Sequence, residues 1–512
     1  MATELYKTLS ANSRWLITFV VMSATLMQVI DTTIINVALP HMQGSLSTSS
    51  DEITWTLTSY LVSSAIFMPL TGYFSDRFGR KKYLITSIAG FTITSALCGA
   101  ATSLTEIVFF RLLQGIFGAC LVPLSQAILA DIFPPHERGK AMAIWGMGVM
   151  VGPILGPTLG GYLTEYTTWR WTFYVNIPVG VVTLLLASVI PDTPTKSRSM
   201  DWIGLILISL AIGGLQYVLD RGNPDDWFNA TSICVVTYIA ITSFLGFVLY
   251  NMESTTQPVF DLSIFKDINF SLASLLLCIF CLGMYGMMVV QPIMMENLFH
   301  YPALTTGLML APRGISGMIS MMLVGKLIKY IDPRFLVMLG LLINIVGIYL
   351  GTYYSLNDIN PFWLIWPTIL QGFGMGLIFV PLSIIAFTTL AAEMRNEAAG
   401  LYSLLRTIGG SIGISIAITI ATRRAQVFWS DLASFINPYN PAVYRYLHPL
   451  QLHPSQALSA ALLGNELNQQ AQMLAFINVF AFIMWCFILM IPLVFLLKSN
   501  KVSEQPVQTI AE

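Results

Sequence analysis

A single carboxylate lies deep inside a long apolar stretch near the start of the sequence. From Trp15 to Leu39 the only formally charged side chain is Asp31, and of the 26 acidic residues only this one falls well inside such a stretch. A basic side chain, Arg111, lies inside another apolar stretch that begins near Glu106. A carboxylate beside an arginine can stay ionised until a proton or a bound substrate competes for it, so these residue types predict proton-coupled binding.

The depths of the two side chains follow if both stretches are helices. Asp31 lies eight residues before Leu39, which is about 12 Å at 1.5 Å per residue. Arg111 lies five residues after Glu106, about 8 Å by the same rise. Because both depths fall in the outer half of the apolar layer, we predict a direct ion pair between Asp31 and Arg111. A fixed pair that only holds two helices together is the structural alternative.

The composition identifies the surroundings of this pair as a lipid bilayer. The 512 residues are 55% hydrophobic and 10% charged, with a mean hydropathy of +0.71, whereas soluble proteins carry about 25% charged residues. Apolar stretches of about 20 residues, each long enough to span a bilayer as a helix, recur along the chain. A charged aspartate at mid-helix costs at least about 2.5–3.5 kcal/mol, so Asp31 is predicted to be functional.

These stretches predict an all-α, polytopic membrane protein with fourteen spans. Net charge is −1, which gives no indication of nucleic-acid binding. All five histidines fall in loops and all six cysteines in spans, so neither a metal site nor a disulfide framework is predicted, and no cofactor is expected. The spans lie near 15–39, 53–73, 83–101, 106–130, 139–162, 171–190, 202–219, 231–251, 270–294, 304–328, 335–354, 362–389, 397–421 and 475–497.

The distribution of lysine and arginine orients the chain. With a cytoplasmic N-terminus, 17 of the 25 basic residues fall on the inner side, five on the outer side and three inside spans. Positive charge accumulates on the cytoplasmic side of membrane proteins, so both termini are predicted to be cytoplasmic. The polar segment 422–474, rich in Pro and Gln, is then an outer loop.

An internal repeat divides the chain. The Gln-Gly pairs at 114 and 371 are 257 residues apart, and the same offset relates Arg138 to Arg395. Eight spans separate these partners, so two spans are inserted between two six-helix halves, as in repeat-built transporters. The predicted divisions are an N-terminal tail 1–14, a first half 15–190, an inserted pair 191–269, a second half 270–497 and a C-terminal tail 498–512.

Several motifs carry a resemblance to a known family. "GYFSDRFGRKKYL" at 72–84 and "RLLQG" at 111–115 resemble signatures of the major facilitator superfamily. "GVMVGPILGPTLGGYL" at 148–163, "DTTIINVALP", "WRWTFYVNIPVG" and "LDRGNPDDWF" resemble its fourteen-helix drug/proton antiporter branch, of the EmrB/EmrY type. The resemblance covers about residues 15–500. It implies the major facilitator fold and proton-driven multidrug export, with no enzymatic activity.

The loop after the second span contains the first conformational motif. Gly72 and Gly79 allow close packing and a tight turn, and Asp76 can lie near a helix N-terminus, where negative charge is favoured. Arg80 belongs to the same motif. In the family, the aspartate of this motif latches the two halves in the outward-open state, and the predicted partner is the start of span 13 near Asn396. Simple positive-inside charges are the alternative for this loop.

The fifth span contains a second conformational motif of small residues. Its four glycines recur every four residues and permit close backbone approach, while its two prolines bend the helix. A bent, closely packed helix suits a rocking interface, and ordinary small-residue packing is the alternative. The motif consists of Gly148, Gly152, Pro153, Gly156, Pro157 and Gly160.

Four more polar residues inside spans are candidates for the substrate cavity. These are Gln28, Gln114, Arg313 and Arg406. Two roles stay open for the arginine in "SLLRTIGGSIG", a structural role and a role in coupling. The spans contain three arginines but only one aspartate. This excess of positive charge favours neutral or weakly acidic lipophilic substrates over dications.

The sequence as a whole predicts a proton-coupled multidrug exporter of the inner membrane that works by alternating access. Its ligands are small lipophilic drugs and protons, within a lipid bilayer. By resemblance, its partners are a periplasmic adaptor protein and an outer-membrane channel. Two alternatives stay open: a proton-coupled or facilitative nutrient importer, and a non-transporting membrane sensor or scaffold.

Overall fold

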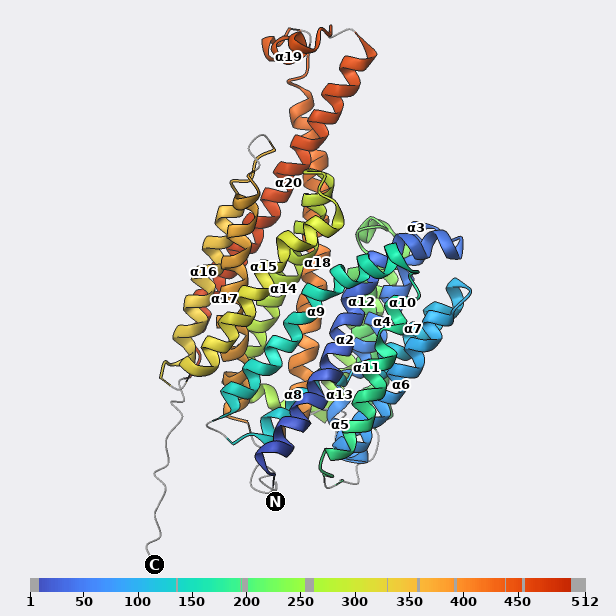
Figure 1. Ribbon diagram of the computed structural model, residues 1–512, viewed down its shortest axis with the longest axis vertical. Coiled ribbons are helices and arrows are strands. Elements are labelled where there is room, and N and C mark those ends of the chain that lie inside the picture. The colour runs from blue at the N-terminus through green and yellow to red at the C-terminus, as the bar shows by residue number, and fades with distance from the viewer. Residues whose placement is uncertain are drawn as a thin grey trace, which may run out of the picture.

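The described part of the chain is a bundle of long helices. A computed structural model describes residues 9–134, 137–193, 195, 201–253, 262–328, 330–356, 360–390, 394–437, 439–453 and 456–498 (Figure 1). No strand occurs within these ranges. Twelve of the helices described there are long and apolar enough to cross a membrane. Every predicted span coincides with one helix or with two or three consecutive helices, which confirms the all-α membrane fold.

The described residues of the predicted first half contain ten α-helices, of which several form broken spans. They are α2 (Ala11–Leu46), α3 (Ser50–Ile53), α4 (Trp55–Phe67), α5 (Thr71–Phe78), α6 (Arg80–Ala100), α7 (Leu104–Gly118), α8 (Leu121–Ile132), α9 (Arg138–Tyr166), α10 (Trp171–Tyr174) and α11 (Asn176–Leu186). The sequence predicted unbroken spans at 53–73 and 106–130. Both break next to a proline, Pro69 and Pro123, because proline has no N–H and its ring crowds the preceding turn.

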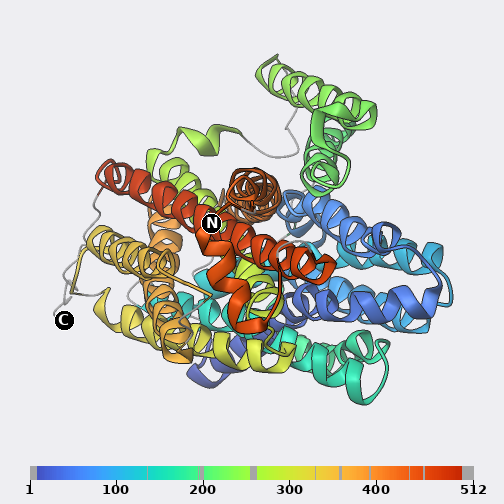
Figure 2. The ribbon, with the colours of Figure 1, turned by 90° about the horizontal axis from the view of Figure 1, so that it is seen from above.

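The rest of the described chain contains the helix pair predicted as an insertion and a second group of long helices. The predicted insertion is α12 (Trp202–Arg221) and α13 (Thr231–Glu253). The second group is α14 (Ile268–Asn297), α15 (Ala303–Leu327), α16 (Pro333–Gly351), α17 (Pro361–Thr388), α18 (Arg395–Ala433) and α20 (Ala457–Val494), with the short α19 (Pro441–Leu447) before α20. From above, α12 and α13 lie at the edge of the molecule (Figure 2), where α12 packs against α4 and α18.

The segment predicted as an outer loop at 422–474 is largely helical. α18 continues to Ala433 and α20 begins at Ala457, so these helices have 39 and 38 residues. Each is about 57 Å long, whereas the hydrocarbon layer is about 30 Å thick. The two helices rise above the rest of the molecule as a hairpin that bears α19 (Figure 1). The segment that we predicted as an outer loop is therefore built largely from the ends of these two helices and from α19.

Glycines bring α9 into direct contact with α2. A β-carbon at Gly152 would lie 2.3 Å from the side chain of Val29, and one at Gly156 would lie 2.0 Å from Thr33 Oγ1. Any larger residue would force the helices apart. The hydroxyl of Thr33 also donates to the carbonyl of Gly152, at 3.1 Å. Close packing by the glycine stripe is thus confirmed, while the side chains of Pro153 and Pro157 lie outside the described residues.

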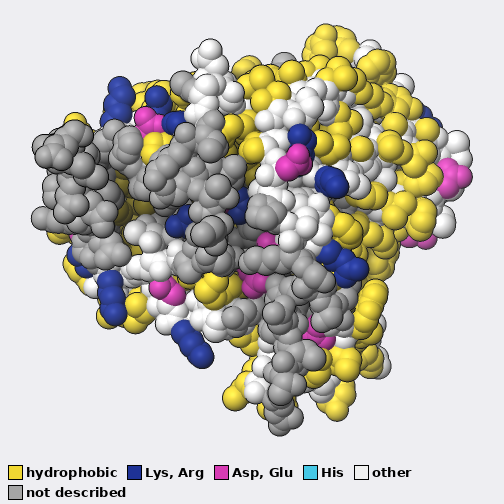
Figure 3. All heavy atoms as spheres, turned by 90° about the horizontal axis from the view of Figure 1, so that it is seen from below, with side chains coloured by type: hydrophobic (Ala, Val, Ile, Leu, Met, Phe, Trp, Pro, Cys, Tyr) yellow, Lys and Arg dark blue, Asp and Glu magenta, His cyan; other side chains and the backbone are white. Residues whose placement is uncertain are grey.

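The two halves meet at the lower end of the molecule, where α2 begins and α20 ends (Figure 1). A β-carbon at Gly72 in α5 would lie 2.9 Å from the Cα of Glu397 at the start of α18. A β-carbon at Gly325 in α15 would lie 3.1 Å from Ala143 near the start of α9. Lysine and arginine side chains are spread over this lower face (Figure 3).

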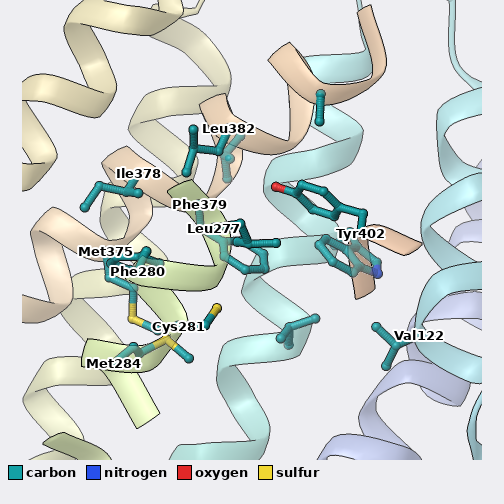
Figure 4. Close-up of a cluster of buried hydrophobic side chains, with 14 of the residues drawn as sticks. Val122, Leu277, Phe280, Cys281, Met284, Met375, Ile378, Phe379, Leu382 and Tyr402 are labelled. Atoms are coloured by element: carbon teal, nitrogen blue, oxygen red, sulfur yellow. The ribbon is translucent and has the colours of Figure 1, made fainter. Parts of the chain in front are cut away.

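A buried apolar cluster fills the seam above these contacts. It joins Val122 of α8 to side chains of the second half, including Phe280, Phe379 and Tyr402 (Figure 4). The Trp145 ring of α9 stacks on Phe379 at a centroid distance of 5.6 Å. Apolar burial of this kind stabilises the closed lower end without fixed polar bonds.

Candidate functional site

The predicted ion pair is present between α2 and α7. Arg111 Nη1 lies 2.6 Å from Asp31 Oδ2, and both side chains are 1% exposed. A pair this short is a charge-assisted hydrogen bond, which is stronger than a neutral one. The matched depths of Asp31 and Arg111 in the sequence therefore identified a real contact.

Two amides hold the other carboxylate oxygen. Asp31 Oδ1 accepts from Gln114 Nε2 at 3.0 Å and from Asn176 Nδ2 at 2.9 Å. The Gln114 carbonyl in turn accepts from Arg111 Nη1 at 2.9 Å. Gln114, predicted as a residue of the substrate cavity, is thus fully buried in the ion-pair network in this conformation.

Sequence reasoning missed the role of Asn176. This residue opens α11, and Ser95 of α6 fixes its amide by accepting a second hydrogen bond at 3.1 Å. The side chain lies in "WRWTFYVNIPVG", which was noticed only as part of the resemblance. An uncharged amide costs far less to bury in a membrane than the charge of Asp31, so the residue type alone did not identify Asn176 as part of the site.

Backbone and aromatic groups enclose the guanidinium of Arg111. Its Nε donates to the carbonyl of Thr56 at 3.1 Å. Its Cζ lies 4.3 Å from the centre of the Tyr60 ring and 5.7 Å from that of Phe173, within the range of cation–π attraction. The charge is therefore kept in a protein environment in which electrostatic attraction to Asp31 is only weakly screened.

This geometry defines what the carboxylate can do. Asp31 accepts three hydrogen bonds, one from a cation, so its ionised form is well satisfied in this conformation. Its side chain is 1% exposed. In this conformation the carboxylate is therefore closed to solvent.

The remaining cavity candidates occupy different surroundings. Gln28 is buried, and its carbonyl accepts from the backbone N–H of Val122, at 3.2 Å, beside the break between α7 and α8. Arg406 is also buried, with its Cζ 5.9 Å from the Trp145 ring, and its Nη1 has no hydrogen-bond partner among the described residues. Arg313 lines a small cavity inside the second half.

The motif after the second span forms a charged cluster between the halves. Gly79 has a φ of +82°, a conformation that glycine adopts without strain, and it makes the predicted tight turn. Arg80 Nη1 lies 2.6 Å from Asp131 Oδ2, and Arg395 of α18 lies 3.4 Å from the other oxygen of Asp131. Asp76 is half-buried on α5, which packs against α18. Asp131 directly follows the span predicted at 106–130, and the sequence did not indicate this contact.

One further acid lies at the outer end of α12. Asp220 is half-buried and accepts a hydrogen bond from the hydroxyl of Thr58 in α4. The predicted span ended at 219, so this residue was assigned to a loop. It lies apart from the ion-pair network, since none of the hydrogen bonds described there includes it.

Comparisons with known proteins agree with this architecture. The family model of the Major Facilitator Superfamily matches residues 21–414. The "Probable multidrug resistance protein EmrY" of Escherichia coli (strain K12) is 34% identical over 496 residues, 96% of each chain. The "Multidrug export protein EmrB" of the same strain is 35% identical over 440 residues, 85% of this chain and 86% of that protein. The solved structure of the proton:xylose symporter XylE, 13% identical, superimposes with a TM-score of 0.64 over 96% of this chain and 98% of that chain.

Proposed function

Because this chain belongs to the Major Facilitator Superfamily, among the multidrug exporters of the EmrB/EmrY type, we propose that it exports lipophilic drugs in exchange for protons. The observation that carries the proton coupling is the buried Asp31 carboxylate, held by Arg111, Gln114 and Asn176. The relatives' names indicate export, so a nutrient importer is not favoured.

The proposed cycle uses the occlusion of Asp31. In the outward-open state the carboxylate takes a proton, which neutralises it and weakens its attraction to Arg111. After the halves rock, the proton leaves to the cytoplasm and substrate has moved outward. One charge crossing 100 mV supplies about 2.3 kcal/mol, which is enough to drive a substantial drug gradient.

The lower-end contacts support the proposed latch. The close approach of Gly72 to Glu397, together with the Asp131 cluster, joins the halves on the face over which lysine and arginine side chains are spread (Figure 3). We assign that side to the cytoplasm and the protein to the inner membrane. Asp76 would contact the start of α18, where free N–H groups and the helix dipole favour an acid.

The projecting hairpin supports the proposed partners. It extends from the face opposite the latch (Figure 1). Its exposed aromatic side chains include Trp429, Phe435, Tyr439, Tyr444 and Tyr446. Aromatic side chains are enriched in protein interfaces, so a periplasmic adaptor that leads to an outer-membrane channel is the proposed partner. Under the proposed division, α12 and α13 are an inserted pair outside the two six-helix halves.

The experiment that tests the proposal is proton-driven transport in proteoliposomes. A screen of lipophilic weak acids and cations under an imposed pH gradient first identifies a transported drug. Asp31→Asn is then expected to abolish gradient-driven transport while the protein stays folded and binds the drug. Asp220→Asn is the matched control, since this acid lies apart from the network, and it is expected to retain transport. Wild-type rates in the Asp31 variant would refute the proton-carrier assignment.

A further inference from the structure

The internal repeat identifies the position in the second half that corresponds to Asp31. Two glycines of α9 contact α2, and two glycines 257 residues later in α18 contact α14. The contacted residues of α14 follow those of α2 by 249 residues. With this register, Phe280 in α14 takes the place of Asp31 in α2. The contacts that define the register are Gly152 to Val29, Gly156 to Thr33, Gly409 to Cys278 and Gly413 to Leu282.

The corresponding site in the second half contains the equivalent amide but no acid. Gln371 lies 257 residues after Gln114 and lines the same cavity as Phe280. Its Nε2 donates to the carbonyl of Gly347, and its Oε1 accepts from Gln291, both at 3.4 Å. A cavity therefore lies where the first half has its buried ion pair.

A cation from another helix enters this cavity. Arg313 of α15 donates through Nη1 to the carbonyl of Gln291 at 3.0 Å. Across the residues that the structure describes, no carboxylate pairs with Arg313, and the Gln291 amide is the only hydrogen-bond partner of its guanidinium. A guanidinium has five N–H donors, so most of its hydrogen-bonding capacity is left for a ligand.

The walls of the cavity fit an apolar ligand body. They include Phe280 and Phe487 together with three methionines, Met284, Met287 and Met375. Methionine side chains are flexible and polarizable, so they can move aside for ligands of different shapes. The cavity is small in this conformation, and an apolar chain would enter it by displacing these side chains.

We propose that this cavity binds the carboxylate of a lipophilic acidic substrate, with Arg313 as its counter-ion. The ligand's carboxylate supplies the negative charge that Asp31 supplies in the first half, and Gln291 and Gln371 add neutral polar groups beside it. This assignment rests on the proposed function, because it names the class of drug that the exporter carries. It also separates the two ligands: the proton binds in the first half and the acid in the second.

Binding of matched probes tests the site without a proton gradient. Radiolabelled decanoate and methyl decanoate have the same chain, but only the first is charged at neutral pH. Binding to the protein in phosphatidylcholine nanodiscs is measured against nanodiscs without protein. Arg313→Gln is expected to weaken decanoate binding at least about tenfold, the value of a charge-assisted hydrogen bond, with little effect on methyl decanoate. Arg313→Lys should restore part of the loss.

A second variant places a competing charge inside the site. Gln291→Glu is nearly isosteric and puts a carboxylate 3.0 Å from Arg313 Nη1, so it should exclude decanoate while methyl decanoate still binds. Arg423→Gln, an exposed position at the outer end of α18, controls for lost positive charge and should bind both probes normally. Equal decanoate binding by wild type, Arg313→Gln and Gln291→Glu would overturn the assignment. That result would leave Asp31-dependent transport intact, whereas failure of the proposed function would remove that transport and leave the binding pattern unchanged.

Discussion

Asn176 provides the sharpest test of how the site holds a proton. Its Nδ2 donates to Asp31 Oδ1 at 2.9 Å and to Ser95 Oγ at 3.1 Å, and its side chain is 2% exposed. Asn176→Leu has almost the same size and removes both donors. Because the site is closed to solvent, no water replaces the lost hydrogen bond, and the ionised carboxylate is destabilised more than the protonated one.

The size of the effect follows from the type of bond that is lost. A hydrogen bond to a charged group contributes about 1.5–3 kcal/mol. Since about 1.36 kcal/mol corresponds to one pH unit, the pH midpoint of proton-coupled transport should rise by about one to two units. The sign is positive because loss of a donor to the ionised form makes protonation easier, so it occurs at higher pH.

The assay is drug transport in proteoliposomes, titrated over a wide pH range at a fixed pH difference. Ser95→Ala is the matched control, because it leaves the bond from Asn176 to Asp31 in place and should move the midpoint much less. The two variants should elute as folded protein in size-exclusion chromatography. A midpoint for folded Asn176→Leu that is unchanged or lower than that of the wild type would refute the role of this donor.

Three further changes test other parts of the structure. Gly72→Ala places a β-carbon 2.9 Å from the Cα of Glu397, so it should separate α5 from α18, reduce crosslinking between cysteines at their lower ends and slow turnover. Asp131→Asn removes two partly exposed ion pairs, each of about 0.2–1 kcal/mol, and should increase labelling of an inward-facing cysteine. Gln28→Leu leaves the Val122 N–H without its acceptor, at a cost of about 1–3 kcal/mol, which should appear as a lower melting temperature with normal assembly.

The membrane fold could be predicted because the residue types show where polar groups would be costly to place in a lipid bilayer. Twenty apolar residues in a row have few alternatives to a spanning helix. A charge among them is expensive, which singled out Asp31 and Arg111 before their contact was known. The distance of each residue from the end of its span gave its depth, so the ion pair followed from counting residues along two helices.

The parts that could not be predicted involve uncharged polar groups and segments outside the apolar spans. For these, the cost of burying a charge in the membrane gives no information. Asn176 is uncharged and opens a helix, so only its contact with Asp31 reveals its role. The outer helices of the hairpin are polar, and hydropathy does not distinguish a solvent-exposed helix from a loop. The breaks at Pro69 and Pro123 depend on neighbours that tolerate a kink, as when Gln28 accepts the N–H of Val122.

The packing connects the proposed proton site to the seam between the halves through two helices. Asp31 ties α2 to α7 and α11, so neutralising it changes how firmly α2 is held. On its other side α2 meets α9 at glycines, where the backbones touch and no bulky side chain absorbs a shift. The lower part of α9 reaches the second half, since a β-carbon at Gly139 would lie 2.7 Å from Ile328. A displacement of α2 is therefore transmitted to α15, the helix that carries Arg313, by direct contact at each step.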